Sequence, residues 1–258
     1  MRFEFDGDRY KAASSHQKQW GARLIAELGL TGDERVLDLG CGDGVLTEQL
    51  GQRLPEGRVL GIDASNGMIQ TAQNHARSNV SFELMDINDL TFISEFDVIF
   101  SNATLHWVKD HRRLLTNVHR ALRANGLLRF NFAGDGNCRH FIHVVQEVIR
   151  QDAFAASFRQ FDWPWYMPDV QEYRSLLSRT PFRETRVWEE DADQYFPSAE
   201  AMIGWIDQPS IIPFLQHLDD RDGRRFRDRV VESMLEQTRQ ADGRYWETFR
   251  RINVFARK

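Results

Sequence analysis

The chain has 258 residues, of which 41% are hydrophobic and 28% are charged, and its formal net charge at pH 7 is −5. This composition is typical of a globular protein, and the length suits one large α/β domain with an insertion. No long basic run provides the surface that a nucleic-acid-binding protein needs. The cysteines, Cys41 and Cys138, are too few and too far apart for a disulfide framework or a structural zinc site.

The sequence contains no apolar stretch long enough for a signal peptide or a membrane span. We therefore expect a cytoplasmic protein with no membrane partner, no nucleic-acid partner and no bound metal. Monomer and homodimer both stay open as the oligomeric state.

The first half of the chain predicts strands that alternate with helices. An amphipathic helix is expected over residues 14–28, where Trp20, Leu24 and Leu28 recur at helical spacing and Gly29 follows as a stop. Five predicted strands, separated by helices, lie at residues 35–39, 58–62, 80–84, 96–100 and 127–132. This alternation is typical of a parallel, doubly wound α/β sheet.

After Gly134 the pattern changes. Helices are expected at 139–150, at 170–177 and over most of 198–240, with a sixth strand at 183–188 and a last long strand at 246–256. We predict one domain over residues 1–258, with a core at 14–133 and a helical cap at about 134–181 and 198–240. The predicted fold is a Rossmann-like, seven-stranded, mostly parallel sheet with an antiparallel last strand and a helical cap.

A glycine-rich turn at residues 38–44 follows the first predicted strand and opens the next helix. Its sequence is Asp-Leu-Gly-Cys-Gly-Asp-Gly, with glycines at alternate positions. Glycine permits the tight turn and lets a ligand lie against the backbone, while the helix N-terminus offers free N–H groups. The turn therefore predicts a nucleotide-type cofactor at the carboxyl end of the first strand.

Polar residues follow the next strands in the same way. Asp63 ends the second strand about 20 residues after the last glycine, where a carboxylate accepts hydrogen bonds from both ribose hydroxyls. Asp86 and Ile87 follow the third strand, and Ser101 and Asn102 follow the fourth. The carboxyl ends of parallel strands meet at one edge of a sheet, so these residues are expected to share a site.

The G-x-G-x-G spacing, preceded by Asp38, resembles the cofactor signature of class I S-adenosylmethionine-dependent methyltransferases, and the resemblance covers residues 14–133. It differs from the G-x-G-x-x-G of dehydrogenases. The resemblance implies S-adenosyl-L-methionine as cofactor, with S-adenosyl-L-homocysteine as product. Gly40, Cys41 and Gly42 would line its methionine part, while Asp38 would hydrogen-bond toward it or hold the turn.

The same resemblance implies the other cofactor contacts. Asp63 would bind the ribose, Ala64 and Met68 would pack on the adenine ring, and Asp86 and Ile87 would contact the edge of that ring. Asn102 would lie near the amino-acid end, and Gln17, with Tyr10 and His16, would close over the cofactor. The carboxylates also have structural alternatives, in which Asp38 caps the turn, Asp63 caps a helix and Asp86 adds loop polarity. Cys41 is expected to be a small contact residue rather than a nucleophile.

The second half narrows the resemblance. Residues 101–108, 205–215 and 249–257 resemble the trans-aconitate 2-methyltransferase group, and residues 101–108 also resemble the related malonyl-acyl-carrier-protein and juvenile-hormone-acid methyltransferases. All of these esterify carboxylates, which implies O-methylation of a small acid. Ile212 stands where the trans-aconitate group tends to have an arginine, so a less charged acid than a tricarboxylate is plausible. N- or C-methylation of another small metabolite, and a cofactor-binding protein without activity, stay open.

His106 is the candidate catalytic residue, because an amine, hydroxyl or carbon acceptor needs a base whereas a carboxylate is already ionised. A substrate-orienting hydrogen bond or simple packing are the alternatives for this histidine. Five aromatic residues are predicted to form the substrate wall, with packing inside the cap as their alternative. They are Trp107, Trp163, Trp165, Tyr166 and Trp205.

Overall fold

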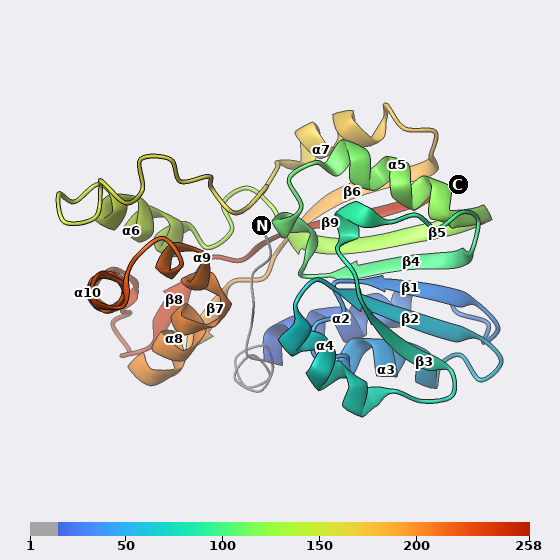
Figure 1. The fold of residues 1–258 in the computed structure, drawn as a ribbon, viewed down its shortest axis with the longest axis horizontal. Coiled ribbons are helices and arrows are strands. Elements are labelled where there is room, and N and C mark those ends of the chain that lie inside the picture. Colours follow the sequence, from blue (N-terminus) through green and yellow to red (C-terminus); the bar gives the residue numbers. More distant parts are fainter. Residues whose placement is uncertain (1–14) are drawn as a thin grey trace. The chain divides into compact units, whose positions relative to one another are not determined.

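The computed structural model describes residues 15–258, except for the side chains of residues 15–17, 208 and 209. The chain divides into two compact units (Figure 1). The first unit comprises the residues up to Asp135 together with Trp165–Glu190 and Arg251–Lys258, and the second comprises Gly136–Pro164 and Asp191–Arg250.

The first unit contains a seven-stranded sheet in the order β3-β2-β1-β4-β5-β9-β6. Neighbouring strands from β1 to β5 pair in parallel, whereas β9 is antiparallel to β5. The predicted Rossmann-like sheet with an antiparallel last strand is confirmed. Its strands are β1 (Arg35–Leu39), β2 (Arg58–Asp63), β3 (Val80–Leu84), β4 (Phe96–Asn102), β5 (Leu122–Ala133), β6 (Arg183–Asp191) and β9 (Arg250–Arg257).

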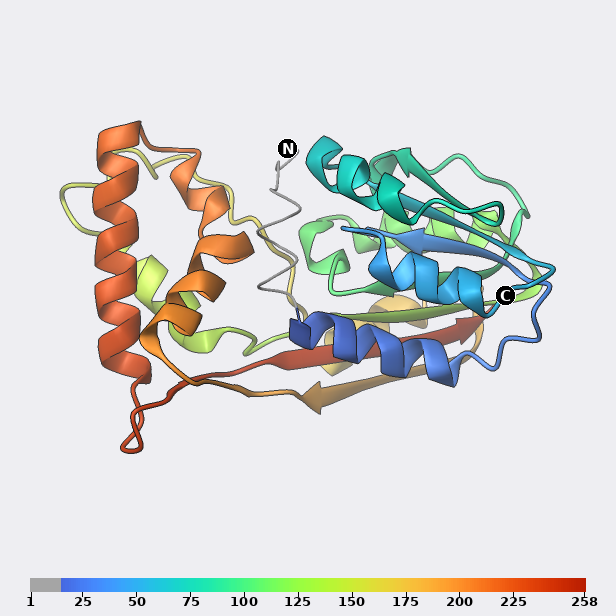
Figure 2. The same cartoon turned by 90° about the horizontal axis from the view of Figure 1, so that it is seen from below.

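Helices cover both faces of this sheet, with α2 and α3 lying on the face turned toward the viewer in Figure 2. Along β1, Val36 packs in one apolar cluster with α2, α3 and α4, while Leu37 and Leu39 pack in a second cluster with α5 and α7. This alternation follows from the strand's period of two and explains why β1 is apolar on both faces. The helices are α2 (Ser15–Glu27), α3 (Val45–Gln52), α4 (Asn66–Ala72), α5 (His111–Ala121) and α7 (Val170–Leu177), with short 3₁₀ turns η1 (Gln73–His75), η2 (Ile87–Asp89) and η3 (Leu105–Trp107).

The strand order reverses at β1, because β2 and β3 lie on one side of it and β4 and β5 lie on the other. Ligands of open α/β sheets bind beyond the carboxyl ends of the strands at such a switch point. The turns that follow β1 and β4 therefore mark the place to look for a site.

The second unit is mainly helical and includes a two-stranded sheet of β7 and β8. Aromatic rings form much of its interior, for example Phe154, Phe158 and Phe214, which each pack against Phe226. Residues 198–240, predicted to be mostly helical, form α8 and α10 with a π-helical turn and a short helix between them. Its elements are α6 (Arg139–Ile149), β7 (Gln194–Phe196), α8 (Ala199–Trp205), η4 (Ile206–Ser210), α9 (Ile212–Leu215), α10 (Asp220–Thr238) and β8 (Tyr245–Glu247).

The predicted single last strand over residues 246–256 is wrong, because the chain forms β8 and β9 in two different sheets. The break has a specific cause. The Glu247 carboxylate is buried and accepts hydrogen bonds from the backbone N–H groups of His140 and Phe141, at distances of 3.2 and 2.9 Å. The end of β8 thus satisfies backbone N–H groups in the first turn of α6, and the strand does not continue.

Residues 165–181, predicted as part of a cap, lie in the first unit, where Tyr173 and Leu177 of α7 join the apolar cluster on the sheet. The role of the second unit as a cap stays a prediction.

Candidate active site

The glycine turn after β1 is fixed to the end of β2. The backbone N–H groups of Gly40 and Cys41 both donate to the carbonyl oxygen of Ile62, at 2.8 and 2.9 Å. Gly40, Gly42 and Gly44 have φ values of 73, 54 and 84°, in the left-handed region that favours glycine. The turn conformation therefore depends directly on the three glycines that the sequence singled out.

Two of these glycines have a packing reason in addition. A Cβ on Gly40 would lie 2.1 Å from Cγ2 of Thr104, and one on Gly44 would lie 2.9 Å from Cβ of Ala72. At Gly42 a Cβ would meet no atom of the described residues within 4 Å. The backbone at Gly42 thus faces open space, which is the kind of surface that a ligand approaching the turn requires.

Asp63 joins the end of β2 to this turn. Its Oδ2 accepts a hydrogen bond from the backbone N–H of Gly42 at 3.0 Å, and its Oδ1 accepts one from the N–H of Ser65 at 2.9 Å. The Asp63 side chain is half-buried. The Asp63 carboxylate and the exposed backbone of the turn fit a nucleoside whose ribose hydroxyls donate hydrogen bonds to Asp63.

Asp38 is buried and accepts a hydrogen bond from Oγ1 of Thr47 at 2.7 Å, which ties β1 to α3. Burial raises the pKa of Asp38 to about 7, with the charge of Asp63 acting in the same direction and the Thr47 hydrogen bond opposing it. Burial also raises the pKa of the Cys41 thiol well above its ordinary value, so that this cysteine is a poor nucleophile.

The residues predicted near an adenine ring lie around the ends of β2 and β3. Asp86 caps η2, since its Oδ1 accepts hydrogen bonds from the backbone and side-chain nitrogens of Asn88, both at 2.8 Å. Met68 in α4 and Ile87 are 3% and 7% exposed, and Ala64 is half-buried. The ends of β2 and β3 therefore combine apolar side chains with carboxylates. Such a composition suits a heterocycle that bears an amino group.

The loop after β4 is fastened to the glycine turn. Oγ1 of Thr104 donates to the carbonyl oxygen of Gly40 at 3.1 Å, and the N–H of Ala103 donates to the carbonyl oxygen of Asn131 at 2.7 Å. Ala103 has a φ of 58°, which is unusual for a non-glycine residue and costs conformational energy. Asn102, which is buried, precedes this strained residue and lies close to the position where a Cβ on Gly21 would stand.

His106 follows in η3. Its backbone carbonyl accepts a hydrogen bond from the N–H of Tyr166 at 2.8 Å. Its Nδ1 is buried and has no hydrogen-bond partner among the described residues. Burial, together with the positive charge of Arg251, lowers the pKa of His106 to about 3. The imidazole is therefore neutral at pH 7 and a weak base.

Sequence reasoning missed Arg251 and Asn131. Arg251 in β9 is 4% exposed, and its Nε and Nη2 donate to Oδ1 of Asn131 in β5, at 2.9 and 2.6 Å. Its guanidinium lies over the Trp20 ring, 4.6 Å from the centroid. The sequence nevertheless contained a signal for both residues. Polar residues occupy alternate positions of two otherwise apolar strands, Arg129 and Asn131 in β5 and Arg251 and Asn253 in β9.

The five aromatic residues predicted to line a substrate wall divide between the units. In the first unit, the Trp107 and Trp165 rings pack at 5.6 Å, and Tyr166 packs against His111 at 4.7 Å. In the second, Trp163 packs against Phe161 and Phe214, and Trp205 packs against Phe141, Phe196 and Phe249. Three predicted cofactor contacts lie outside what the structure describes: Tyr10 and the side chains of His16 and Gln17.

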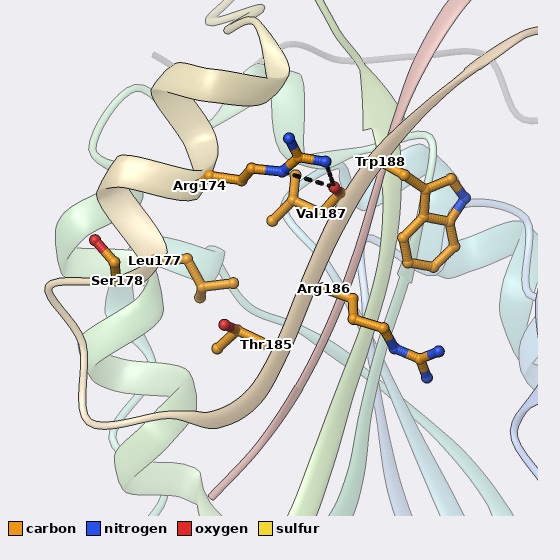
Figure 3. Close-up of a pocket in the computed structure, with 7 residues that line it drawn as sticks. All are labelled: Arg174, Leu177, Ser178, Thr185, Arg186, Val187 and Trp188. Atoms are coloured by element: carbon orange, nitrogen blue, oxygen red, sulfur yellow. Dashed lines mark hydrogen bonds between the residues drawn. The ribbon is translucent and has the colours of Figure 1, made fainter.

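A pocket of about 670 Å³ lies elsewhere, between α7 and the edge strand β6 (Figure 3). Arg174 spans it by donating from Nε and Nη2 to the carbonyl oxygen of Val187, at 3.1 and 2.8 Å. The pocket includes none of the predicted site residues. Its lining residues are Arg174, Leu177, Ser178, Thr185, Arg186, Val187 and Trp188.

Within the described part of the chain, no group of three or more His, Cys, Asp or Glu side chains is arranged to hold a metal ion. In the same part, every helix is too short or too polar to cross a membrane.

Comparison with known proteins identifies the family. A family model described as a methyltransferase domain matches residues 36–126, which hold the glycine turn, Asp63, Asp86 and Asn102. The trans-aconitate 2-methyltransferase of Deinococcus radiodurans is 31% identical over 197 residues, which are 75% of this chain and 76% of the relative. The chain belongs to the class I S-adenosylmethionine-dependent methyltransferases. The predicted family and enzyme class are confirmed.

A second relative of this methyltransferase matches almost the whole chain, and solved structures share its fold. The trans-aconitate 2-methyltransferase of Escherichia coli K12 is 29% identical over 258 residues, 96% of each chain. Among solved structures, the YcgJ protein of Bacillus subtilis superposes with a TM-score of 0.64 at 17% identity, over 93% of this chain and 98% of that one. Phosphoethanolamine N-methyltransferase 2 of Haemonchus contortus, solved with S-adenosyl-L-methionine, has a TM-score of 0.62 at 18% identity, over 98% of this chain and 56% of that one. The solved structures support the fold.

Proposed function

We propose that this methyltransferase esterifies a carboxylate of a small organic acid. S-Adenosyl-L-methionine supplies an electrophilic methyl group on a positively charged sulfur. A carboxylate oxygen of the acceptor forms the new C–O bond as the C–S bond breaks, and the electron pair of that bond stays on sulfur. The products are a methyl ester and S-adenosyl-L-homocysteine, and no proton is transferred.

The burial of the His106 ring nitrogen Nδ1 supports the choice of a carboxylate as the acceptor, because burial disfavours the charged imidazole and makes it a weak base. A neutral amine or hydroxyl acceptor must lose a proton, and a base with a pKa of about 3 removes it poorly at neutral pH. A carboxylate has no proton to lose. The names of the relatives, which act on trans-aconitate, point to the same acceptor chemistry. Methylation of nitrogen or carbon is the alternative that this argument disfavours.

In this proposal the cofactor lies against the turn after β1. The open backbone face at Gly42 admits it, while Gly40 and Cys41 keep the turn in place through Ile62. Asp63 accepts from the ribose, and Asn102 lies toward the amino-acid end. Asp38 supports the turn from inside through Thr47. The adenine would be held by Ala64, Met68, Asp86 and Ile87, and Gln17 stays a predicted contact.

The acceptor would lie beyond the ends of β4 and β5, where η3 carries His106 and Trp107. Trp165 packs against Trp107, and the N–H of Tyr166 donates to the carbonyl oxygen of His106. Aromatic rings exclude water from the reacting atoms and thereby favour an in-line displacement that needs positioning more than acid–base groups. A role of Trp163 and Trp205 toward the substrate stays a prediction, and their aromatic partners in the second unit equally suit packing.

Incubation with S-adenosyl-L-methionine labelled in the methyl group, together with mono-, di- and tricarboxylic acids, tests the proposal. We expect labelled esters that release labelled methanol when treated with base. Labelled products stable to base would overturn carboxylate methylation. Calorimetric binding of the cofactor, with no labelled product from any acceptor, would instead support the cofactor-binding protein without activity. The cytoplasmic location, the monomer or homodimer, and the lack of metal, membrane and nucleic-acid partners stay predictions.

A further inference from the structure

An ion pair joins the first described helix to the glycine turn. Nζ of Lys18 in α2 lies 2.7 Å from Oδ2 of Asp43, and the side chains are 22% and 7% exposed. Asp43 stands between Gly42 and Gly44, whose positive φ values shape the turn. The cofactor contacts proposed above include neither charged group.

Gly21 brings α2 close to the same region. A Cβ on Gly21 would lie 2.2 Å from Cδ1 of Leu46 in α3 and 3.1 Å from Nδ2 of Asn102 at the end of β4. Residues three apart in a helix share a face, so Lys18 and Gly21 lie on the same side of α2. One turn of α2 therefore lies against the glycine turn, the first turn of α3 and the end of β4.

The two halves of α2 are held by different contacts. Leu24 and Ile25 bury the C-terminal half in an apolar cluster that includes Leu50 of α3. Those contacts do not depend on charge. Nearer the N-terminus, Trp20 is buried and Lys18 makes the ion pair. Of these contacts, the ion pair is the one made with the glycine turn.

Loss of one charge should disturb the turn more than the pair itself stabilises it. A charge shielded from water keeps its desolvation penalty when its partner is removed. Without Lys18, the Asp43 carboxylate is best satisfied by water that enters between α2 and the turn. The neighbouring Gly42 donates its N–H to Asp63, so a movement of Asp43 also reaches the carboxylate proposed to bind the ribose.

We propose that Lys18 and Asp43 are positioning residues for the cofactor. Their ion pair holds the N-terminal half of α2 against the glycine turn and thereby keeps Gly42 and Asp63 in the arrangement that binds S-adenosyl-L-methionine. The inference rests on the cofactor position in the proposed function, and it adds α2 as a wall of that site. It does not depend on which atom of the acceptor is methylated.

Calorimetry of the full chain with S-adenosyl-L-homocysteine tests the pair. We expect Lys18→Met to raise the Kd at least about tenfold. Adding Asp43→Asn to Lys18→Met should recover much of this loss, because no buried charge then remains. Lys18→Arg keeps the charge and should bind better than Lys18→Met. Arg23→Met is the matched control, since Arg23 lies on the same helix and its pair with Glu190 is more exposed; its Kd should stay within about twofold.

Hydrogen–deuterium exchange separates positioning of α2 from general stability. In the original protein and in Arg23→Met, S-adenosyl-L-homocysteine should slow the exchange of amides 18–21 and of the glycine turn. In Lys18→Met, amides 18–21 should lose this protection, while the amides of β1 and β4 should exchange as in the original protein. The measurement on the original protein needs no variant to fold, and α2 amides that the ligand leaves unchanged would overturn the inference.

The outcomes distinguish the inference from the proposed function. If esters form and Lys18→Met keeps the original Kd, the ion pair has no positioning role while the proposed function stands. The inference also fails if Lys18→Met speeds exchange throughout the sheet, because the pair then only stabilises the fold. If Lys18→Met weakens binding as expected but the labelled product is stable to base, the inference stands and carboxylate methylation fails.

Discussion

The two units of this methyltransferase use their buried side chains differently. At the strand ends of the first unit, polar groups such as Asp38, Asp63 and Arg251 are fixed by hydrogen bonds to backbone or to neutral side chains. In the second unit, the Glu247 carboxylate is fixed in the same way, but rings such as Trp205 and Phe226 pack against other rings. The difference is consistent with our proposal that the cofactor binds to the first unit, whereas the aromatic residues of the second unit pack against one another.

Replacement of Trp205 should show the difference between the two units most clearly, because it should affect stability without affecting cofactor binding. Trp205 is 4% exposed and contacts three phenylalanine rings. We expect Trp205→Ala to lower the free energy of unfolding by about 3–5 kcal/mol, because it leaves a cavity. Urea unfolding measures this loss, and calorimetry should show a cofactor Kd within about twofold. Trp205→Phe is the control, and equal losses of cofactor affinity in both variants would contradict the division between the units.

The buried Asp38 predicts a pH dependence that belongs to the first unit. Its pKa is about 7 when folded and near 3.8 when unfolded, so the folded protein binds more protons between these values. The free energy of unfolding should therefore fall as the pH rises from about 4 to 7, by at most about 4 kcal/mol from this group. Urea unfolding across this range should show the decline in the original enzyme and in Trp205→Phe, but a smaller one in Asp38→Asn. Identical slopes in all three would show that Asp38 is ionised in the folded protein.

Gly40 and Gly42 test which glycine the fold requires and which the ligand requires. Gly40→Ala combines a left-handed φ with a Cβ 2.1 Å from Thr104, so we expect a loss of about 3 kcal/mol in the free energy of unfolding. Gly42→Ala meets open space and should cost about 1 kcal/mol. Thermal unfolding measures both. In calorimetry, Gly42→Ala should weaken cofactor binding by more than its effect on unfolding, and unchanged affinity would place the cofactor away from this turn.

Asp63→Asn should mainly affect binding. The amide keeps one acceptor oxygen but loses the charge and the second acceptor, which should weaken S-adenosyl-L-methionine binding by about 2 kcal/mol, roughly thirtyfold. Asp97→Asn is the matched control, since Asp97 also accepts from a backbone N–H, that of Arg35 at 2.8 Å, at the amino end of β1. Calorimetry at one salt concentration compares them, and equal losses in both variants would rule out a specific role for Asp63.

Much of the first unit was readable from the sequence, because its signals are local. The alternation of apolar strands with helices predicted the sheet, and the spacing of three glycines predicted a turn whose φ values are positive at Gly40, Gly42 and Gly44. The break between β8 and β9 was missed because it depends on Glu247 capping a helix that begins at Arg139, more than a hundred residues earlier.

The sequence by itself determined the fold class and the enzyme family, since strand period, glycine spacing and strand-end carboxylates are properties of short segments. Only the tertiary structure decided how the polar groups are used. Arg251 and Asn131 are 120 positions apart and meet because β9 inserts antiparallel beside β5. Burial, which no short segment specifies, sets the pKa values of Asp38 and His106 in opposite directions, because it disfavours the charged form of each.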